Sequence, residues 1–118
     1  MFKLGDKARI VREYSIQYAN PIQVVAGEKV SVEREDDEFP GWVWCRAADG
    51  RQGWVPIELL AQPGREAIAR EAYSARELAV QPGEEVVVLD SRHGWLKVRN
   101  MQGESGWIPE SNVEQTHN

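Results

Sequence analysis

The fold is decided by a stretch that occurs twice, first as Gly41-Trp42-Val43-Trp44-Cys45-Arg46-Ala47-Ala48-Asp49-Gly50-Arg51-Gln52-Gly53-Trp54-Val55-Pro56 and again as Gly94-Trp95-Leu96-Lys97-Val98-Arg99-Asn100-Met101-Gln102-Gly103-Glu104-Ser105-Gly106-Trp107-Ile108-Pro109. The two copies align without a gap. Seven of their sixteen positions are identical: two Gly-Trp pairs, an arginine, a glycine and the final proline. Internal similarity of this kind indicates a duplicated structural unit.

A second pair of similar segments lies upstream of each copy. Residues 26–32 read AGEKVSV and residues 82–88 read PGEEVVV. The turn-forming stretch Gln62-Pro63-Gly64 separates the two repeats. The sequence therefore predicts two domains, 1–62 and 63–118, each close to the lower size at which a domain folds alone.

Both repeats have the pattern of short strands separated by turns. Polar and apolar residues alternate in 29–33 and 95–99, and Asp49-Gly50 and Gln102-Gly103 stand where hairpins would reverse. Residues 66–76 contain several alanines, but the equivalent stretch of the first repeat looks extended, so we expect a strand and a loop there. The predicted fold is all-β, with two small β-barrels in tandem. Their very short connection would hold the barrels close, packed against each other.

The alternation also predicts which side chains are buried. Val43 and Cys45 share one face of a strand, as do Leu96 and Val98. Because the second pair is wholly apolar, this face is expected to be core, and Cys45 is expected to behave as a small hydrophobe. Trp42 and Trp44 then point outward.

Composition limits the classes of partner. The 118 residues carry a formal net charge of −5, and we find no local basic patch. Such a chain is poorly suited to phosphate backbones or anionic membranes, so neither nucleic acid nor membrane is an expected partner. The single cysteine, the absence of a long apolar run and the absence of an apolar N-terminal stretch favour a cytoplasmic location.

The sequence offers no catalytic arrangement and no metal site. Its two histidines are His93 and His117, and neither has a Cys or His partner at zinc-ligand spacing. The acidic run 33–38 does not match an EF-hand loop. No glycine-rich phosphate loop is present. We therefore predict a protein that is not an enzyme and needs no cofactor.

The two repeats resemble tandem Src-homology-3 (SH3) domains, of the variant type found in bacterial proteins. The similarity rests on the order and spacing of short motifs rather than on any one of them. In the first repeat these are PIQVVAGE at 21–28, Gly41-Trp42, Gly53-Trp54-Val55-Pro56 and 57–60. In the second they are ELAVQPGE at 77–84, Gly94-Trp95, Gly106-Trp107-Ile108-Pro109 and 110–113.

The resemblance implies an aromatic groove on each barrel that binds an extended, proline-containing peptide. Carried onto this sequence, the groove of the first repeat contains Tyr14, Trp42, Trp54 and Pro56. The groove of the second contains Tyr73, Trp95, Trp107 and Pro109. Two aromatic positions of the family are absent, because Arg12 and Leu59 replace them in the first repeat, and Glu71 and Asn112 in the second.

An acidic run precedes the groove residues of the first repeat. It contains Glu35, Asp36, Asp37 and Glu38 and leads directly to Trp42. One interpretation is a solvated loop; the other is a set of carboxylates that attracts an arginine or lysine of the ligand. The second repeat has Asp90-Ser91-Arg92-His93 instead, so the first repeat is expected to be the better binder.

The favoured function is non-catalytic recognition of a protein or an extended peptide, proline-containing or basic. One alternative is a structural or regulatory protein whose tryptophan faces form a domain seam or a dimer interface; burial of Trp42 and Trp95 would favour it. Trp44, which has no aromatic counterpart, is the first candidate for an inter-domain contact. A further alternative is the cell-wall-binding role of bacterial SH3 repeats. The oligomeric state is left open.

Overall fold

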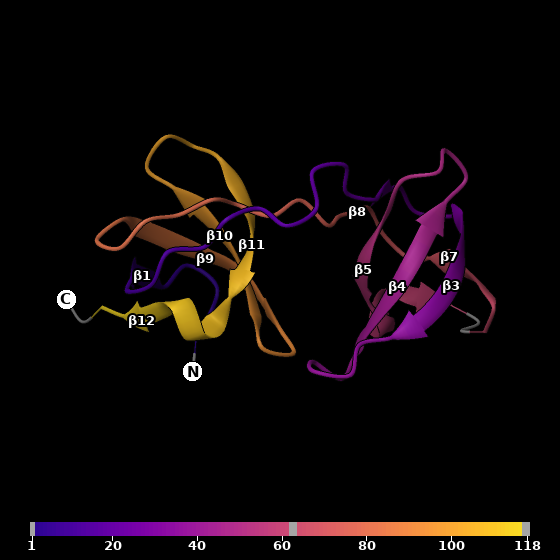
Figure 1. Cartoon of the computed structure of the whole chain (residues 1–118), viewed down its shortest axis with the longest axis horizontal. Helices are drawn as coiled ribbons and strands as arrows, with labels where there is room; N and C mark the ends of the chain where they lie inside the picture. Colours follow the sequence, from indigo (N-terminus) through magenta and orange to yellow (C-terminus); the bar gives the residue numbers. More distant parts are fainter. Residues whose placement is uncertain (1, 62–63, 117–118) are drawn as a thin grey trace. The chain divides into compact units, whose positions relative to one another are not determined.

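The computed structural model describes residues 2–61 and 64–116 of the chain (Figure 1). These residues form two compact units. The first, here called the split unit, combines Met1–Gln17 with Glu77–Asn118; the second, the continuous unit, is Tyr18–Arg76. The chain therefore leaves the split unit after residue 17 and returns to it at residue 77.

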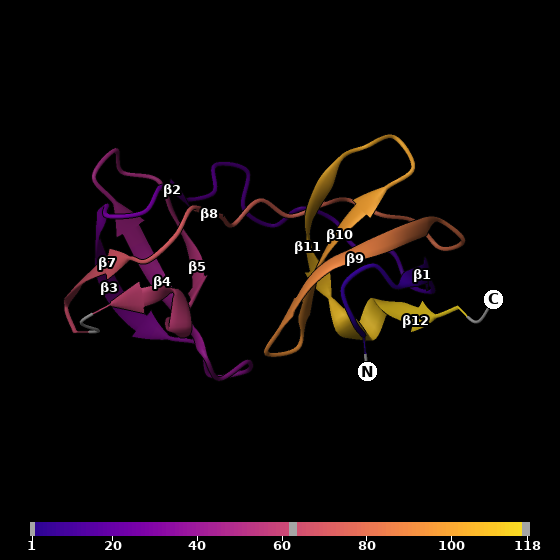
Figure 2. The same cartoon turned by 180° about the vertical axis from the view of Figure 1, so that it is seen from behind.

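The split unit is built on one five-stranded antiparallel sheet with the order β11-β10-β9-β1-β12. Figure 2 shows β1 beside β9 and β12. Its elements are β1 (Lys7–Ile10), β9 (Glu85–Arg92), β10 (Trp95–Asn100), β11 (Ser105–Pro109), the 3-10 turn η2 (Glu110–Asn112) and β12 (Val113–Gln115).

The continuous unit repeats this design, with the order β5-β4-β3-β7-β6 and a small additional β2-β8 pair. Its elements are β2 (Gln23–Val24), β3 (Lys29–Glu35), β4 (Trp42–Ala47), β5 (Gln52–Pro56), the 3-10 turn η1 (Ile57–Leu59), β6 (Leu60–Ala61), β7 (Glu66–Ala69) and β8 (Tyr73–Ser74). The all-β prediction is confirmed, and residues 66–76 begin with a strand rather than a helix.

The two sequence repeats exchange their first strands. β1 belongs to the first repeat but pairs with β9 and β12 of the second. In return, β7 of the second repeat pairs with β3 and β6 of the first. The compact units therefore differ from the predicted domains 1–62 and 63–118, and the expected join at residues 62–63 lies outside the described residues.

Each unit has its own hydrophobic core, and the predicted strand parity is confirmed. Val43 and Cys45 lie in the core of the continuous unit, and Leu96 and Val98 lie in that of the split unit. The outward face of β4 is less exposed than the sequence predicts, because the Trp42 side chain is only 3% exposed. Trp42 is nevertheless not part of the apolar core cluster formed by Val43 and its neighbours.

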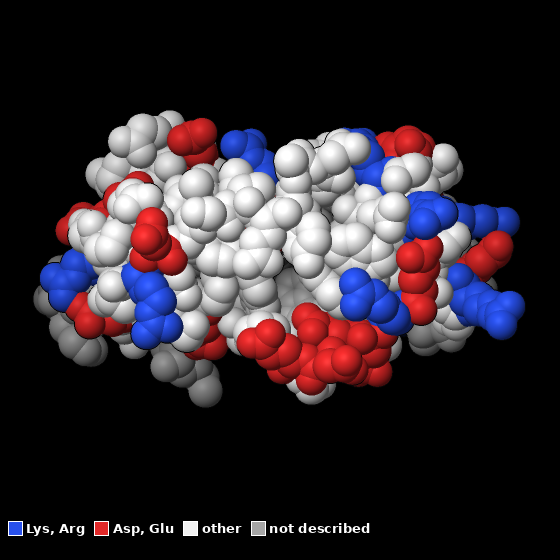
Figure 3. Space-filling model, viewed as in Figure 1, with Lys and Arg blue, Asp and Glu red and all other residues white. Residues whose placement is uncertain are grey.

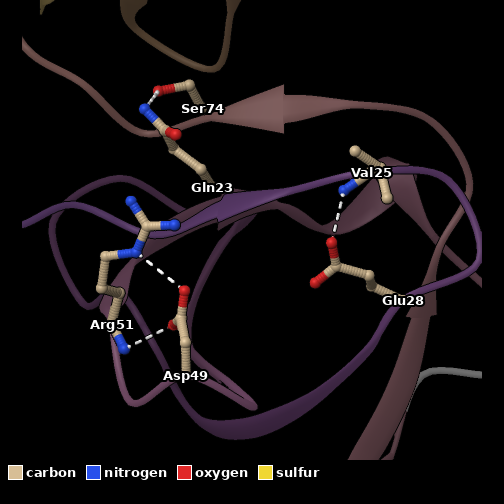
Figure 4. A network of polar contacts seen from close by, with 6 residues as sticks. All are labelled: Gln23, Val25, Glu28, Asp49, Arg51 and Ser74. Atoms are coloured by element: carbon tan, nitrogen blue, oxygen red, sulfur yellow. Dashed lines mark hydrogen bonds and ion pairs between the residues drawn. The ribbon is translucent and has the colours of Figure 1, made fainter.

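Short polar contacts fix the turns of the continuous unit (Figure 4). The carboxylate of Glu28 accepts a hydrogen bond from the main-chain N–H of Val25, and Gln23 contacts Ser74 across the β2-β8 pair. At the β4-β5 hairpin, Asp49 accepts bonds from the main-chain and side-chain N–H groups of Arg51. These two bonds lower the pKa of Asp49.

The described residues include no helix of the length and hydrophobicity required to cross a membrane.

Candidate functional site

The aromatic surface of the split unit brings together residues from both repeats. Trp95 and Pro109 are direct partners across β10 and β11, and both are partly exposed. The rings of Tyr14 and Trp95 meet edge to face, with their centroids 5.8 Å apart and an interplanar angle of 83°. An edge-to-face arrangement is favourable because the positive ring edge meets the negative ring face. Tyr14, Trp95 and Pro109 are here called the Tyr14 surface.

A buried carboxylate holds Tyr14 in place. The Tyr14 hydroxyl donates to Oε2 of Glu77 at 2.7 Å, and the main-chain N–H of Gln17 donates to Oε1 at 2.6 Å. Glu77 is only 6% exposed, so both oxygens depend on these donors in place of water. Glu77 is therefore a positioning residue and not a free acid for a ligand cation.

Close backbone contact locks the Glu77 segment against β11. A Cβ atom at Gly106 would lie 2.6 Å from the carbonyl carbon of Glu77 and 2.8 Å from the nitrogen of Leu78. Glycine permits this approach because it has no side chain. The same strand carries Trp107, whose indole is buried at 4% exposure.

The equivalent surface of the continuous unit is closed. Trp42 pairs with Pro56 across β4 and β5, as Trp95 pairs with Pro109. Trp42 is 3% exposed, and Pro56 is among the fully buried side chains. Tyr73 takes the place of Tyr14, and its hydroxyl donates to the main-chain oxygen of Trp54 at 2.8 Å.

The expected grouping of the site residues is therefore rearranged. Tyr14 joins Trp95 and Pro109 rather than the tryptophans of its own repeat, and Tyr73 joins Trp54. Strand exchange is the physical reason, since each tyrosine follows a strand that has moved to the other repeat's sheet.

Two protein-family models match the chain. The model for the variant SH3 domain matches residues 7–62, and the SH3 domain model matches residues 71–110. The chain belongs to the SH3 family, with two SH3 domains in tandem. Both matches fall within the sequence repeats predicted above. A comparison with curated proteins found no match. SH3 domains are in general non-catalytic modules for interaction with proteins.

Within the first SH3 domain, a cation covers two tryptophans. Arg34, Trp44 and Trp54 form one row across β3, β4 and β5. The Arg34 guanidinium carbon lies 5.6 Å from the ring centroid of Trp44 and 5.0 Å from that of Trp54. At these distances the cation is attracted to the ring electrons. The row lies beside a register shift between Val32 and Arg34.

Trp44 has further partners in the same row. Its ring meets Trp54 at 5.1 Å and Tyr18 at 5.2 Å, and its indole N–H donates to Gln52 at 2.8 Å. These contacts all lie within the continuous unit. Arg34 and Tyr18 were not predicted as site residues. The signal for the arginine is its cross-strand register with Trp44. The inter-domain role expected for Trp44 stays a prediction.

The second SH3 domain has a row at the equivalent positions, but with different charges. Asp90 pairs with Lys97, and Lys97 pairs with Trp107. Asp90 also forms an ion pair of 3.0 Å with Arg92. A carboxylate and an ammonium thus replace the cation and indole of the first domain, so the two outer faces are suited to different ligands.

The acidic run lies at the β3-β4 connection. Glu35, Asp37 and Glu38 are exposed, while Asp36 accepts a bond from the main-chain N–H of Glu38 at 2.9 Å. Figure 3 shows a large group of acidic side chains at the lower edge of the view, and further acidic side chains scattered over the same face. Both sequence interpretations, a solvated loop and a cation-attracting loop, agree with this exposure.

The free thiol is not exposed. Cys45 is completely buried in the core of its unit. Burial, with a smaller contribution from the charge of Glu33, raises the pKa of Cys45 to about 12. A thiol in this state is a poor nucleophile. Among residues 2–61 and 64–116, no cluster of three or more His, Cys, Asp or Glu side chains could hold a metal ion.

Proposed function

We propose that this protein is a non-catalytic recognition module whose working site is the Tyr14 surface. The ligand is an extended segment of another protein that contains proline. A chain of this type is already extended, so it loses little conformational entropy when it docks on flat rings.

The observation that carries the proposal is the partial exposure of Trp95 and Pro109, with the Tyr14 ring held edge to face with the indole. The corresponding Trp42 and Pro56 are buried, which leaves them little surface for a ligand. The Tyr14 surface is therefore a better candidate than the first-repeat groove expected from sequence. Aromatic rings of this size supply much of the energy at protein interfaces.

Charge points to a ligand of modest net charge at this surface. Arg92, the cross-strand neighbour of Trp95, forms an ion pair with Asp90, and Glu77 is buried with its hydrogen bonds made. The acids of the run 35–38 belong to the continuous unit, so they are not assigned to the Tyr14 surface. Recognition would then depend on apolar stacking more than on ionic contacts.

The test is a titration of the isotope-labelled chain followed through the indole N–H signals of its five tryptophans. The probes are a proline-rich decapeptide and a glycine-serine decapeptide of the same net charge. The proline-rich peptide is expected to move the Trp95 signal, and Trp95→Ala is expected to abolish binding. Trp44→Lys, which copies Lys97 of the other repeat, is the matched control and should bind normally. The proposal fails if the Trp95 signal stays unmoved or both peptides act alike.

A structural role for the two buried tryptophans is the second candidate. Trp42 and Trp107 are 3% and 4% exposed, which favours packing over ligand contact. Trp42→Phe should then lower the unfolding temperature while the affinity for the decapeptide stays the same. A loss of affinity without a loss of stability would overturn this assignment.

A further inference from the structure

β1 and β7 occupy the same place in two equivalent sheets. Ala8 pairs with Val86 in the split unit, and Ala67 pairs with Val30 in the continuous unit. Val30 and Val86 are equivalent positions of the repeat. The backbone ladder would thus accept either strand in either sheet. Side chains must decide which pairing forms.

The first selective position is Arg9 and its counterpart Ile68. Arg9 lies between Glu85 on β9 and Glu114 on β12, and it forms an ion pair with Glu114. Ile68 lies instead between Lys29 and Ala61. If the strands changed places, Arg9 would face Lys29 and Ile68 would face two glutamates. Opposite charges across a sheet stabilise it, and like charges destabilise it.

The second selective position is Ile10 and its counterpart Ala69. Ile10 pairs with Val113 in one core, and Ala69 pairs with Leu60 in the other. Both side chains are buried, at 1% and 3% exposure. If the strands changed places, isoleucine would crowd Leu60 while alanine left a cavity beside Val113. Overpacking and cavities are both destabilising.

We infer that Arg9 and Ile10 on β1, together with Ile68 and Ala69 on β7, select the exchanged pairing over the one in which each SH3 repeat closes its own barrel. These four are positioning residues. They bring Tyr14 to Trp95, because Tyr14 follows β1 along the chain. The inference concerns strand choice and does not depend on the proposed ligand.

Engineered cysteine pairs distinguish the two pairings. Ser31 and Glu66 are cross-strand partners with exposed side chains. Lys7 would take the place of Glu66 if each repeat closed its own barrel. Facing residues of antiparallel strands lie within the span of a disulfide. The experiment therefore oxidises two monomeric variants, Ser31→Cys/Glu66→Cys and Ser31→Cys/Lys7→Cys, and maps the links by mass spectrometry. Cys45 is buried and stays out of the reaction.

The expected result is a link between positions 31 and 66 and none between 31 and 7. Each cysteine pair is then introduced into a chain that also carries four substitutions: Arg9→Ile, Ile10→Ala, Ile68→Arg and Ala69→Ile. This fourfold change should reverse the result, with the 31–7 link exceeding the 31–66 link by at least tenfold. A 31–7 link in the parent chain, or a 31–66 link that persists in the reversed chain, would overturn the inference.

A milder variant guards against failure of the fourfold change to fold. Arg9→Ile with Ile68→Arg alters only an exposed and a partly exposed side chain and leaves both cores intact. It should raise the proportion of the 31–7 link several-fold, and an unchanged proportion counts against the inference. Arg51→Ile is the matched control, because Arg51 forms its ion pair with Asp49 at the β4-β5 hairpin and not on β3 or β7. It should leave the parent pattern intact.

Discussion

Tyr14 and Trp95 come from different sequence repeats, yet their rings meet edge to face at 5.8 Å. The contact exists because β1, which precedes Tyr14, pairs with β9 and β12 of the other repeat. Glu77 completes the arrangement by accepting the Tyr14 hydroxyl. The aromatic surface of the split unit is therefore a product of strand exchange.

Removal of the Tyr14 hydroxyl should destabilise the split unit while the ring contact remains. In Tyr14→Phe, the buried Glu77 carboxylate loses a donor that water does not readily replace. A buried polar group that loses its partner costs about 1–3 kcal/mol, and a charged group costs more. Thermal unfolding followed by circular dichroism should show a corresponding fall in the midpoint. Tyr18→Phe, at an exposed position, is the control and should leave the midpoint unchanged.

Gly106→Ala should lower the free energy of unfolding more than Gly53→Ala does at the equivalent position. At Gly106 the new Cβ would meet backbone atoms of Glu77 at 2.6 and 2.7 Å, which cannot move alone. At Gly53 it would meet side-chain carbons of Ala75 and Ile22 at 3.0 Å. Overpacking costs about 1–3 kcal/mol, and Gly106→Ala should lie at or above the upper end.

Urea titration of both variants provides the measurement. Gly64→Ala is the control, since its nearest neighbour would be 3.9 Å away. Equal losses at positions 53 and 106 would contradict the close approach of the Glu77 segment to β11.

Local features of the fold were predictable from sequence, because alternation and turn residues act over a few positions. The burial of Cys45 and Val98 follows from the parity of one strand each. The partner of Tyr14 was not predictable in this way. β1 and β7 have equivalent patterns, and the choice between them rests on non-local neighbours such as Glu114 and Leu60. Burial of Trp42 was likewise not predicted. Strand parity indicates which face of the sheet a side chain is on, but it does not show whether other residues cover that face.

Arg34 should contribute to stability through the tryptophans that it covers. An exposed cation–π contact contributes about 0.5–1 kcal/mol. Arg34→Ala should therefore lower the free energy of unfolding by about that amount and shift the tryptophan emission spectrum. Arg34→Lys keeps the charge and should retain part of the effect. Arg46→Ala removes a cation from the same sheet without ring contact and should leave the emission unchanged. Identical spectra for both alanine variants would refute the stacking role.

The buried thiol should be inert until the continuous unit unfolds. With its pKa raised from 9.0 to about 12, native Cys45 has about a thousandfold less thiolate near pH 8.5 than an unfolded chain. Alkylation by iodoacetamide, followed by mass spectrometry, should therefore proceed only in denaturant.

The same pKa shift makes stability depend on alkaline pH. The folded value lies above the unfolded one, so the thiol's contribution is complete below pH 9 and is lost as the pH rises from 9 toward 12. Cys45→Ala lacks this dependence and serves as the control. A parent chain and variant with parallel stability profiles in that range would contradict the raised pKa.

Residues 18–76 should fold as a separate protein. This segment holds all five strands of its sheet and the β2-β8 pair in one continuous chain, with β7 after β6 instead of before β3. It also contains the whole apolar cluster around Val43 and Cys45. The fragment is thus an SH3 barrel in a circularly permuted order, and its core does not depend on the split unit.

The isolated fragment is expected to show dispersed amide signals and a cooperative thermal transition. Fragment 1–62 has nearly the same length and is the matched control. It must use β1 where β7 belongs, which places Arg9 against Lys29 and Ile10 against Leu60. It should therefore be the less stable fragment, by about 1–3 kcal/mol from overpacking alone. If 1–62 instead proves the more stable, the order of strands along the chain, and not the side chains of β1 and β7, determines how the two barrels close.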